Sequence, residues 1–149
     1  MITAKQRNIL KMETVVINIT TEYDKALKES AKLLKNGEVV GIPTETVYGL
    51  AANALCENAV KKIFVAKGRP SDNPLIVHIA KFEDLAPLVA EIPEKVKVMA
   101  DAFWPAPLTM IMKKSVKVSN VVSGNLPTVA IRMPKSDYAR AIIEACGLP

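Results

Sequence analysis

Short apolar segments rich in β-branched residues alternate along this chain with longer segments whose apolar residues recur at helical spacing. The strand-type segments are residues 14–19, 38–42, 74–80, 108–114 and 128–133. The helix-type segments run from Thr20 or Thr21 to Asn36-Gly37, from Glu57 or Asn58 to Gly68, and over 82–90, 94–103 and 136–146; residues 119–127 are expected to be a loop. This order predicts an α/β fold with a mixed or largely parallel sheet.

Length and composition indicate a single soluble domain. The chain has 149 residues, of which 50% are hydrophobic and 23% charged, and this is the profile of a globular protein with one core. No apolar run approaches the ~18 residues that cross a bilayer, so we expect no membrane association. The N-terminus has no signal-peptide core, which favours a cytoplasmic protein. We expect residues 1–13 to be an extension, with Met12 as an alternative start, and residues 14–149 to be the domain.

Cysteine content and charge further limit the classes of protein and ligand that fit this sequence. Cys56 and Cys146 are too few for a disulfide framework or a metal site, so we interpret both as packing residues. The net charge is +5, and cations cluster in residues 61–73 and 109–140. An uneven positive field favours anionic ligands such as nucleotides, phosphates or nucleic acid. A solvated basic surface explains the same charge, and both interpretations stay open at this point.

The stretch "GIPTETVYGLAANA", residues 41–54, places polar side chains between two apolar segments. Ligand crevices in open α/β sheets form at strand ends. Thr44, Thr46 and Tyr48 would present hydroxyl groups to such a crevice. The alternative is a capped strand end whose hydroxyls bond the local backbone.

The stretch "AKGRPSDNPLIVH", residues 66–78, combines two cations with turn residues and the only histidine. Lys67 and Arg69 flank Gly68 at a helix end, where they can form a cationic clamp for phosphate or carboxylate. Cations at helix C-termini also arise from the helix dipole alone. His78 lies in an apolar strand, either as a satisfied core residue or as a neutral donor at a crevice.

Two later stretches add a hydroxyl and two arginines. In "FWPAPLTMIM", Trp104 is expected in the core, and Thr109 is the one side chain with a hydroxyl. In "TVAIRMPKSDYAR", Arg132 interrupts a buried strand and therefore needs an anionic partner. A phosphate between Arg132 and Arg140 would satisfy it, as would an ion pair with Asp or Glu. No P-loop, G-x-G-x-x-G, metal-spaced cluster or nucleophile elbow occurs, so an anion site would use scattered side chains.

Together, "PTETVYGLAANA", "AKGRPSDNPLIVHI", "WPAPLT" and "TVAIRMP" resemble the YrdC/YwlC family of threonylcarbamoyl-AMP synthases, over about residues 20–148. The resemblance implies a YrdC-like α/β fold, a twisted, open, mixed sheet with flanking helices around a basic cleft. By position it implies a catalytic pair, Lys67 and Arg69. It implies threonine contacts at Thr44, Tyr48, His78, Thr109 and Ala130, and nucleotide contacts at Lys67, Arg69, Ser71, Asn73, Pro105, Arg132 and Arg140. It implies no protein-bound metal.

The resemblance also implies a reaction and partners. L-threonine, bicarbonate and ATP, with Mg²⁺ on the nucleotide, would give threonylcarbamoyl-AMP and pyrophosphate for threonylcarbamoyladenosine modification of tRNA. Downstream tRNA threonylcarbamoyl-transfer proteins would be partners. The alternatives are a module that binds double-stranded RNA or tRNA, and a non-catalytic relative. The family pattern continues after the last helix with a strand and a PSAN-like loop; residues 1–149 lack both, so we expect a domain that is incomplete at its C-terminus.

Overall fold

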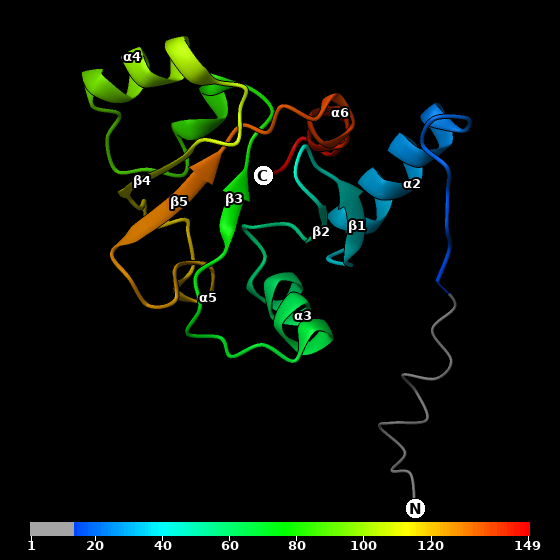
Figure 1. Cartoon of the computed structure of the whole chain (residues 1–149). Coiled ribbons are helices and arrows are strands. Elements are labelled where there is room, and N and C mark those ends of the chain that lie inside the picture. The colour runs from blue at the N-terminus through cyan, green and yellow to red at the C-terminus, as the bar shows by residue number, and fades with distance from the viewer. Residues whose placement is uncertain (1–13) are drawn as a thin grey trace, which may run out of the picture.

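The computed structural model describes residues 14–149; the extension expected over residues 1–13 lies outside the described residues. The fold has a three-stranded mixed sheet at its centre, made of β3 (Ile76–His78), β5 (Thr128–Arg132) and β4 (Thr109–Lys113) in that order. β3 runs parallel to β5, and β4 runs antiparallel to it. Helices surround this sheet (Figure 1), so the α/β prediction with a mixed sheet is confirmed.

The sheet has one buried face and one open face. Along β5, Val129 and Ile131 are buried, whereas Thr128, Ala130 and Arg132 are partly exposed. Because successive side chains of a strand point to opposite faces, this alternation assigns the arginine to the open face. The strand register then places the same face of β3 and β4 beside it, which matters for the site described below.

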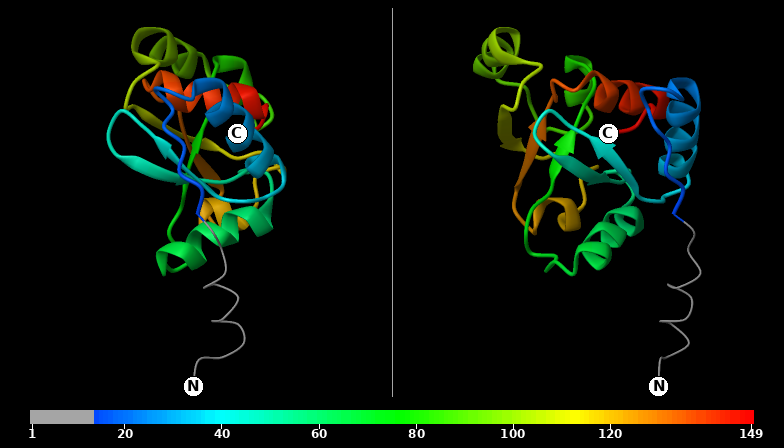
Figure 2. Two further views of the ribbon diagram at one scale, coloured as in Figure 1. Left: turned by 90° about the vertical axis from the view of Figure 1, so that its right-hand side faces the viewer. Right: turned by 45° about the vertical axis from the view of Figure 1, so that its right-hand side comes forward.

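A second, two-stranded sheet lies beside the first. β1 (Val40–Pro43) pairs antiparallel with β2 (Tyr48–Ala51), and residues 44–47 form the connecting turn. The sequence analysis placed a strand only before the polar stretch and missed β2, because Gly49 and the preceding threonines conceal its short apolar pattern. In Figure 2 the hairpin extends beside the central sheet, below helix α6.

The main helices form where the sequence predicts them. α2 (Tyr23–Lys35), α3 (Glu57–Lys67), α4 (Glu94–Phe103) and α6 (Asp137–Cys146) match the expected segments. Gly68 and Gly147 end α3 and α6 in the left-handed conformation, with φ of 59° and 68°, as glycine C-caps do. Ser136 caps α6 by accepting a hydrogen bond from the Ala139 amide at 3.3 Å. None of the helices within residues 14–149 is both long and apolar enough to span a membrane.

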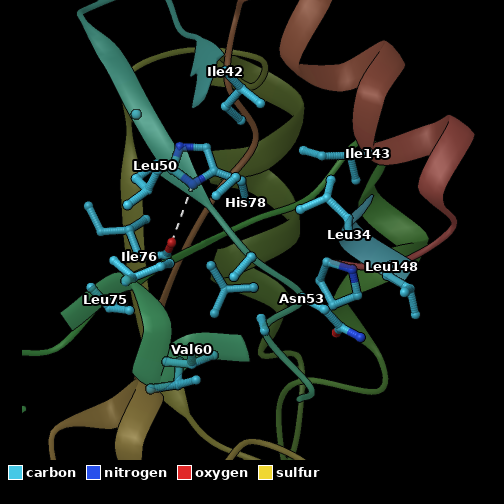
Figure 3. A pocket seen from close by; sticks show the side chains of 18 of the residues that line it. Leu34, Ile42, Leu50, Asn53, Val60, Leu75, Ile76, His78, Ile143 and Leu148 are labelled. Carbon is cyan, nitrogen blue, oxygen red and sulfur yellow. Dashed lines mark hydrogen bonds between the residues drawn. The ribbon is translucent and has the colours of Figure 1, made fainter. Parts of the chain in front are cut away.

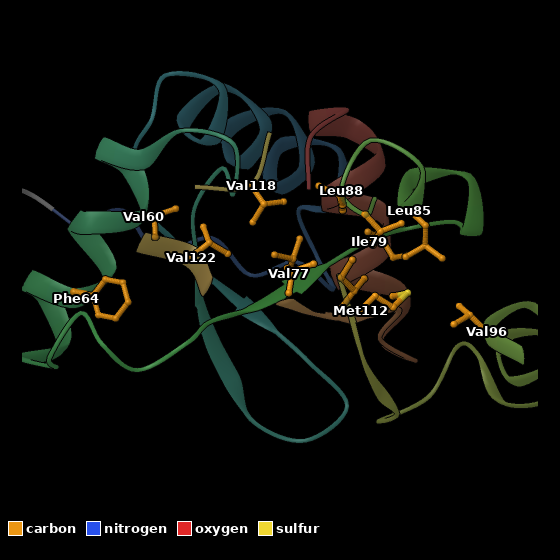
Figure 4. Packing of buried hydrophobic residues seen from close by; sticks show 13 residues of the cluster. Val60, Phe64, Val77, Ile79, Leu85, Leu88, Val96, Met112, Val118 and Val122 are labelled. Atoms are coloured by element: carbon orange, nitrogen blue, oxygen red, sulfur yellow. The ribbon is translucent and has the colours of Figure 1, made fainter. Parts of the chain in front are cut away.

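Two hydrophobic clusters hold these elements together. The larger one packs α3, η1 (Phe82–Leu85), α4 and α5 (Asn120–Ser123) against the buried sheet face, with Ile79, Leu85, Leu88 and Ile131 completely buried (Figure 4). The smaller one joins α2, α6 and β1 through residues such as Leu34, Ile42 and Ile142. Cys146 belongs to this cluster and both cysteines are free, so the interpretation of Cys146 as a packing residue is confirmed. The space between the two clusters becomes the cavity described below.

The strand expected over residues 14–19 does not form. Val15 and Val16 are 74% and 88% exposed, and Asn18 starts a turn by accepting hydrogen bonds from Thr20. β-branched residues favour extended structure only where a neighbouring strand or core receives them, and no such partner lies there in the described chain. The predicted cap is also wrong: Glu22 occupies the N-cap position of α2, and its side chain makes no capping bond.

Three other expectations were partly wrong. The strand predicted over 74–80 is only Ile76–His78, because the Leu75 amide donates to the Val122 carbonyl at 2.9 Å instead of to a strand. The helix predicted over 82–90 is the single 3₁₀ turn η1, which stops before Pro87, a residue without an amide hydrogen. The loop predicted over 119–127 contains the short helix α5, whose Val122 is buried in the larger cluster.

Candidate functional site

A cavity of about 310 Å³ opens between the two hydrophobic clusters (Figure 3). Its walls come from α2, both strands of the hairpin, α3, β3, α5 and α6, together with residues that adjoin these elements. Most of the lining is aliphatic, including Leu34, Ile42, Leu50, Val60 and Ile143. Four polar or charged side chains predicted for the site also line it: Thr44, Lys67, Arg69 and His78. The structure thus brings the end of the first strand, the cationic helix end and the histidine strand to one cavity.

The two cations are placed by the end of α3. The left-handed conformation of Gly68 turns the chain, and the Arg69 amide then donates to the Phe64 carbonyl at 3.0 Å. Neither Lys67 nor Arg69 forms a salt bridge with any side chain of residues 14–149. Both charges are therefore available to an anion in the cavity. By contrast, Lys61 and Lys62 of the same helix pair with Glu57 and Glu38.

The polar residues 44–46 make two kinds of contact, one within the hairpin turn and one with the central sheet. The Thr44 hydroxyl lies 3.2 Å from the Val47 amide and 3.2 Å from the Thr46 hydroxyl, so it closes the turn as well as lining the cavity. Glu45 instead forms an ion pair with Arg132 of β5. The sequence analysis left open an ion pair between Arg132 and an Asp or Glu, but it did not identify Glu45 as the partner. Its signal was present, because a buried arginine requires an anion.

His78, Arg132 and Thr109 form one row across the sheet. His78 pairs in register with Arg132, and Arg132 with Thr109, so the three side chains share the open face. The row below contains Ile76, Ala130 and Ile111. Arg132 and Thr109 do not line the cavity itself. This juxtaposition of residues from three distant segments is set by the strand register alone.

The remaining predicted site residues are not among those that line the cavity. Arg140 pairs with Asp137 and donates to the Pro134 carbonyl. Ser71 and Asn73 are exposed in the connection between α3 and β3, and Pro105 lies in a loop that the Ala106 amide attaches to Met133. Tyr48 is 81% exposed at the start of β2. For these residues the assigned contacts stay predictions.

Burial lowers the pKa of His78 below its ordinary value. Desolvation is the largest cause, the Arg132 charge acts in the same direction, and the Ile76 carbonyl, 3.3 Å from Nδ1, opposes them. The imidazole is therefore neutral near pH 7. A neutral ring in the cavity wall can donate or accept a hydrogen bond without adding charge.

This shift predicts a pH-dependent stability. As pH falls through about 6.5, the histidine of the unfolded chain binds a proton before the folded one does, so the free energy of unfolding decreases. The loss levels off below the folded pKa. Urea unfolding at several pH values should show this decrease for the wild-type protein and a smaller one for His78→Gln. An equal decrease of the free energy of unfolding with pH in the two proteins would contradict the lowered pKa of His78.

An open mixed sheet, flanking helices and a cavity that gathers hydroxyl, imidazole and cationic groups define an α/β domain with one candidate ligand site. Residues 32–149 match the family Sua5_yciO_yrdC, whose description reads "Telomere recombination". The chain belongs to this family, as its motifs indicated.

Relatives with curated names support the same family membership. The chain is 50% identical over 137 residues to a threonylcarbamoyl-AMP synthase of Pyrococcus abyssi, covering 91% of this chain and 40% of the relative. It is 49% identical over 144 residues to the Bacillus subtilis protein of the same name, covering 94% and 42%. The chain therefore spans about two fifths of the length of these relatives.

Solved structures show the same fold. A double variant of Pyrococcus abyssi Sua5 superposes with a TM-score of 0.89 at 50% identity, covering 92% of this chain and 40% of that one. Pyrococcus abyssi Sua5 complexed with L-threonine gives 0.82 at 52% identity, covering 85% and 37%. Escherichia coli YciO, at 20% identity, gives 0.74 and shares the fold.

Proposed function

We propose that the protein forms threonylcarbamoyl-AMP and pyrophosphate from L-threonine, bicarbonate and ATP. The observation that carries this proposal is the shared cavity, in which Thr44, Lys67, Arg69 and His78 meet. Named relatives at 49% and 50% identity support the same activity. The structure of a relative at 52% identity, described as complexed with L-threonine, supports an amino-acid substrate.

The chemistry explains why cations are needed. The threonine amino group captures the one-carbon unit of bicarbonate, with loss of water, and gives a carbamate. A carbamate oxygen then attacks the α-phosphorus of ATP, and pyrophosphate leaves. Two anions must approach each other in this step, so their repulsion has to be offset by fixed positive charge held in line with the attack. No protein nucleophile takes part in this route.

Lys67, the last residue of α3, and Arg69, just after its C-cap, form no salt bridge within residues 14–149 and suit that task. Arg69 can bind two phosphate oxygens at once, and Lys67 supplies a second charge to the carbamate or the phosphates. We assign the nucleotide side to these two residues with Ser71, Asn73, Pro105, Arg132 and Arg140, and the threonine side to Thr44, Tyr48, His78, Thr109 and Ala130. Neutral His78 would donate a hydrogen bond to the threonine carboxylate without a protonation step.

A Mg²⁺ ion is implied by the use of ATP. The cavity lining contains no Asp or Glu, and residues 14–149 hold no cluster of three or more His, Cys, Asp or Glu that could bind a metal. Such an ion would therefore be held by the nucleotide phosphates and water. When bound, it would neutralise phosphate charge, and Lys67 and Arg69 would still orient the reacting groups.

The product determines the biological partners that we propose. A mixed anhydride of a carbamate and AMP is a reactive acyl donor, and it would be used by a transferase that acylates an adenosine of tRNA in the cytoplasm. The partners would therefore be tRNA threonylcarbamoyl-transfer proteins. Direct binding of tRNA or double-stranded RNA to the basic surface is a separate possibility, which the following experiment distinguishes.

The test is an omission experiment. Pyrophosphate release from ATP should require both L-threonine and bicarbonate, and should fall to background when either is left out. Pyrophosphate release at the same rate with and without L-threonine would contradict the proposal. RNA binding with a steep salt dependence, without ATP or threonine binding, would favour the RNA-binding module instead.

A further inference from the structure

One ion pair joins the turn of the hairpin to the central sheet. Glu45 in the 44–47 turn pairs with Arg132 at the end of β5, and their side chains are only 14% and 11% exposed. A second contact supports the same junction, because the Ser136 hydroxyl donates to the Pro43 carbonyl at 3.0 Å. The turn that carries Thr44 and the arginine of the sheet row are thus held in one arrangement.

The pair is incomplete. One guanidinium nitrogen, Nη2, contacts one carboxylate oxygen, Oε1. The second oxygen, Oε2 of Glu45, and Nε of Arg132 are buried without hydrogen-bond partners in the described chain. A pair built for stability would use both oxygens in a bidentate arrangement. Burying two charges for a single contact contributes little net stability, which points to a role in placing the arginine.

The other arginine of this region provides a comparison. Arg140 also pairs with a carboxylate, but its partner Asp137 is 89% exposed, and a second contact to the Pro134 carbonyl fixes its guanidinium. Arg132 has no second side-chain hydrogen bond within residues 14–149. Its guanidinium orientation therefore depends on Glu45, whereas that of Arg140 does not depend on Asp137 alone.

We propose that Glu45 is a positioning residue, which holds the Arg132 guanidinium in the row with His78 and Thr109 so that it can bind a nucleotide phosphate. This inference rests on the proposed function, because it takes Arg132 as a phosphate ligand. The carboxylate itself does not touch the nucleotide. By the same contact, Glu45 couples the Thr44 turn to the position of Arg132, so the threonine and nucleotide sides of the site share one support.

Two substitutions of Glu45 separate the effect of the carboxylate's position on ATP binding from the effect of its charge. Glu45→Asp keeps the charge but withdraws the carboxylate by one methylene, and it should weaken ATP binding by about 10- to 100-fold, because a displacement near 1 Å has effects of that order. Glu45→Gln keeps the length and one hydrogen-bonding oxygen, and it should weaken ATP binding less than about threefold, since a neutral acceptor still holds the guanidinium. Equilibrium ATP titration and the KM for ATP are the measurements, with thermal unfolding to confirm that each variant folds.

Asp137→Ala is the matched control, and it should change ATP binding less than about twofold because its pair is exposed. Unchanged ATP binding in both Glu45 variants would overturn the inference and leave a structural role. A larger effect of Gln than of Asp, or tighter ATP binding in Glu45→Gln, would show that charge matters rather than position, and would also overturn it. If the wild-type protein itself neither binds ATP nor releases pyrophosphate, the proposed function fails instead.

Discussion

Alanine at Arg69 or at Lys67 is expected to lower threonylcarbamoyl-AMP formation by about 10²- to 10³-fold, the usual effect of removing one group that stabilises developing charge. Both side chains line the cavity, and neither forms a salt bridge in the described chain. Their removal therefore breaks no structural pair and should leave the melting temperature nearly unchanged. A coupled pyrophosphate assay measures the rate.

Lys61→Ala is the matched control for these substitutions. It removes the same charge from the same helix, but its ammonium group pairs with Glu57 outside the cavity. Its rate should stay within about twofold of the wild type, because an exposed charge has only a weak, screened effect. Equal losses in Lys61→Ala and Lys67→Ala would mean that net charge, and not a clamp in the cavity, drives the reaction.

Gly124→Ala is expected to lower the free energy of unfolding by about 2–5 kcal/mol through backbone strain and overpacking together. Gly124 has φ of 58°, and an added Cβ would lie 2.6 Å from the Asp72 carbonyl oxygen and 3.1 Å from the Pro74 ring. Asp72 and Pro74 belong to the connection that carries Ser71 and Asn73. The substitution should therefore displace that connection and weaken ATP binding as well. Urea unfolding and ATP titration measure the two effects.

Gly68→Ala is the control that separates backbone strain from overpacking. Gly68 has φ of 59°, but no atom lies within 4 Å of an added Cβ, so it should lose only the strain component, about 1–2 kcal/mol. A stability loss in Gly124→Ala no larger than in Gly68→Ala would contradict the close packing of the 122–125 turn against residues 72–74.

Features with strong local signals were predictable from the sequence. Gly68 and Gly147 follow α3 and α6 in the left-handed conformation and mark the ends of these helices, and the β-branched residues of 128–132 mark β5. Features that depend on tertiary partners were not. Val15 and Val16 favour a strand but find no neighbour, and β2 forms only because β1 lies beside it.

Which residues gather at the cavity could be predicted in part from the sequence, whereas their arrangement could not. The motifs indicated Thr44, Lys67, Arg69 and His78, and these four share a cavity. Sequence could not give the register that aligns His78, Arg132 and Thr109, because parallel pairing of β3 with β5 joins segments about 50 residues apart. The sequence also could not decide whether the Arg132 guanidinium binds a phosphate or a carboxylate, because either anion can pair with a buried guanidinium. In this structure it pairs with the Glu45 carboxylate.

The most direct measurement is a crystal structure of the protein with L-threonine and a non-hydrolysable ATP analogue. The account predicts both ligands in the cavity that Thr44, His78, Lys67 and Arg69 line, with the threonine nitrogen directed toward the α-phosphate. Ligands bound at separate places on the surface, or a triphosphate that contacts neither Lys67 nor Arg69, would contradict it.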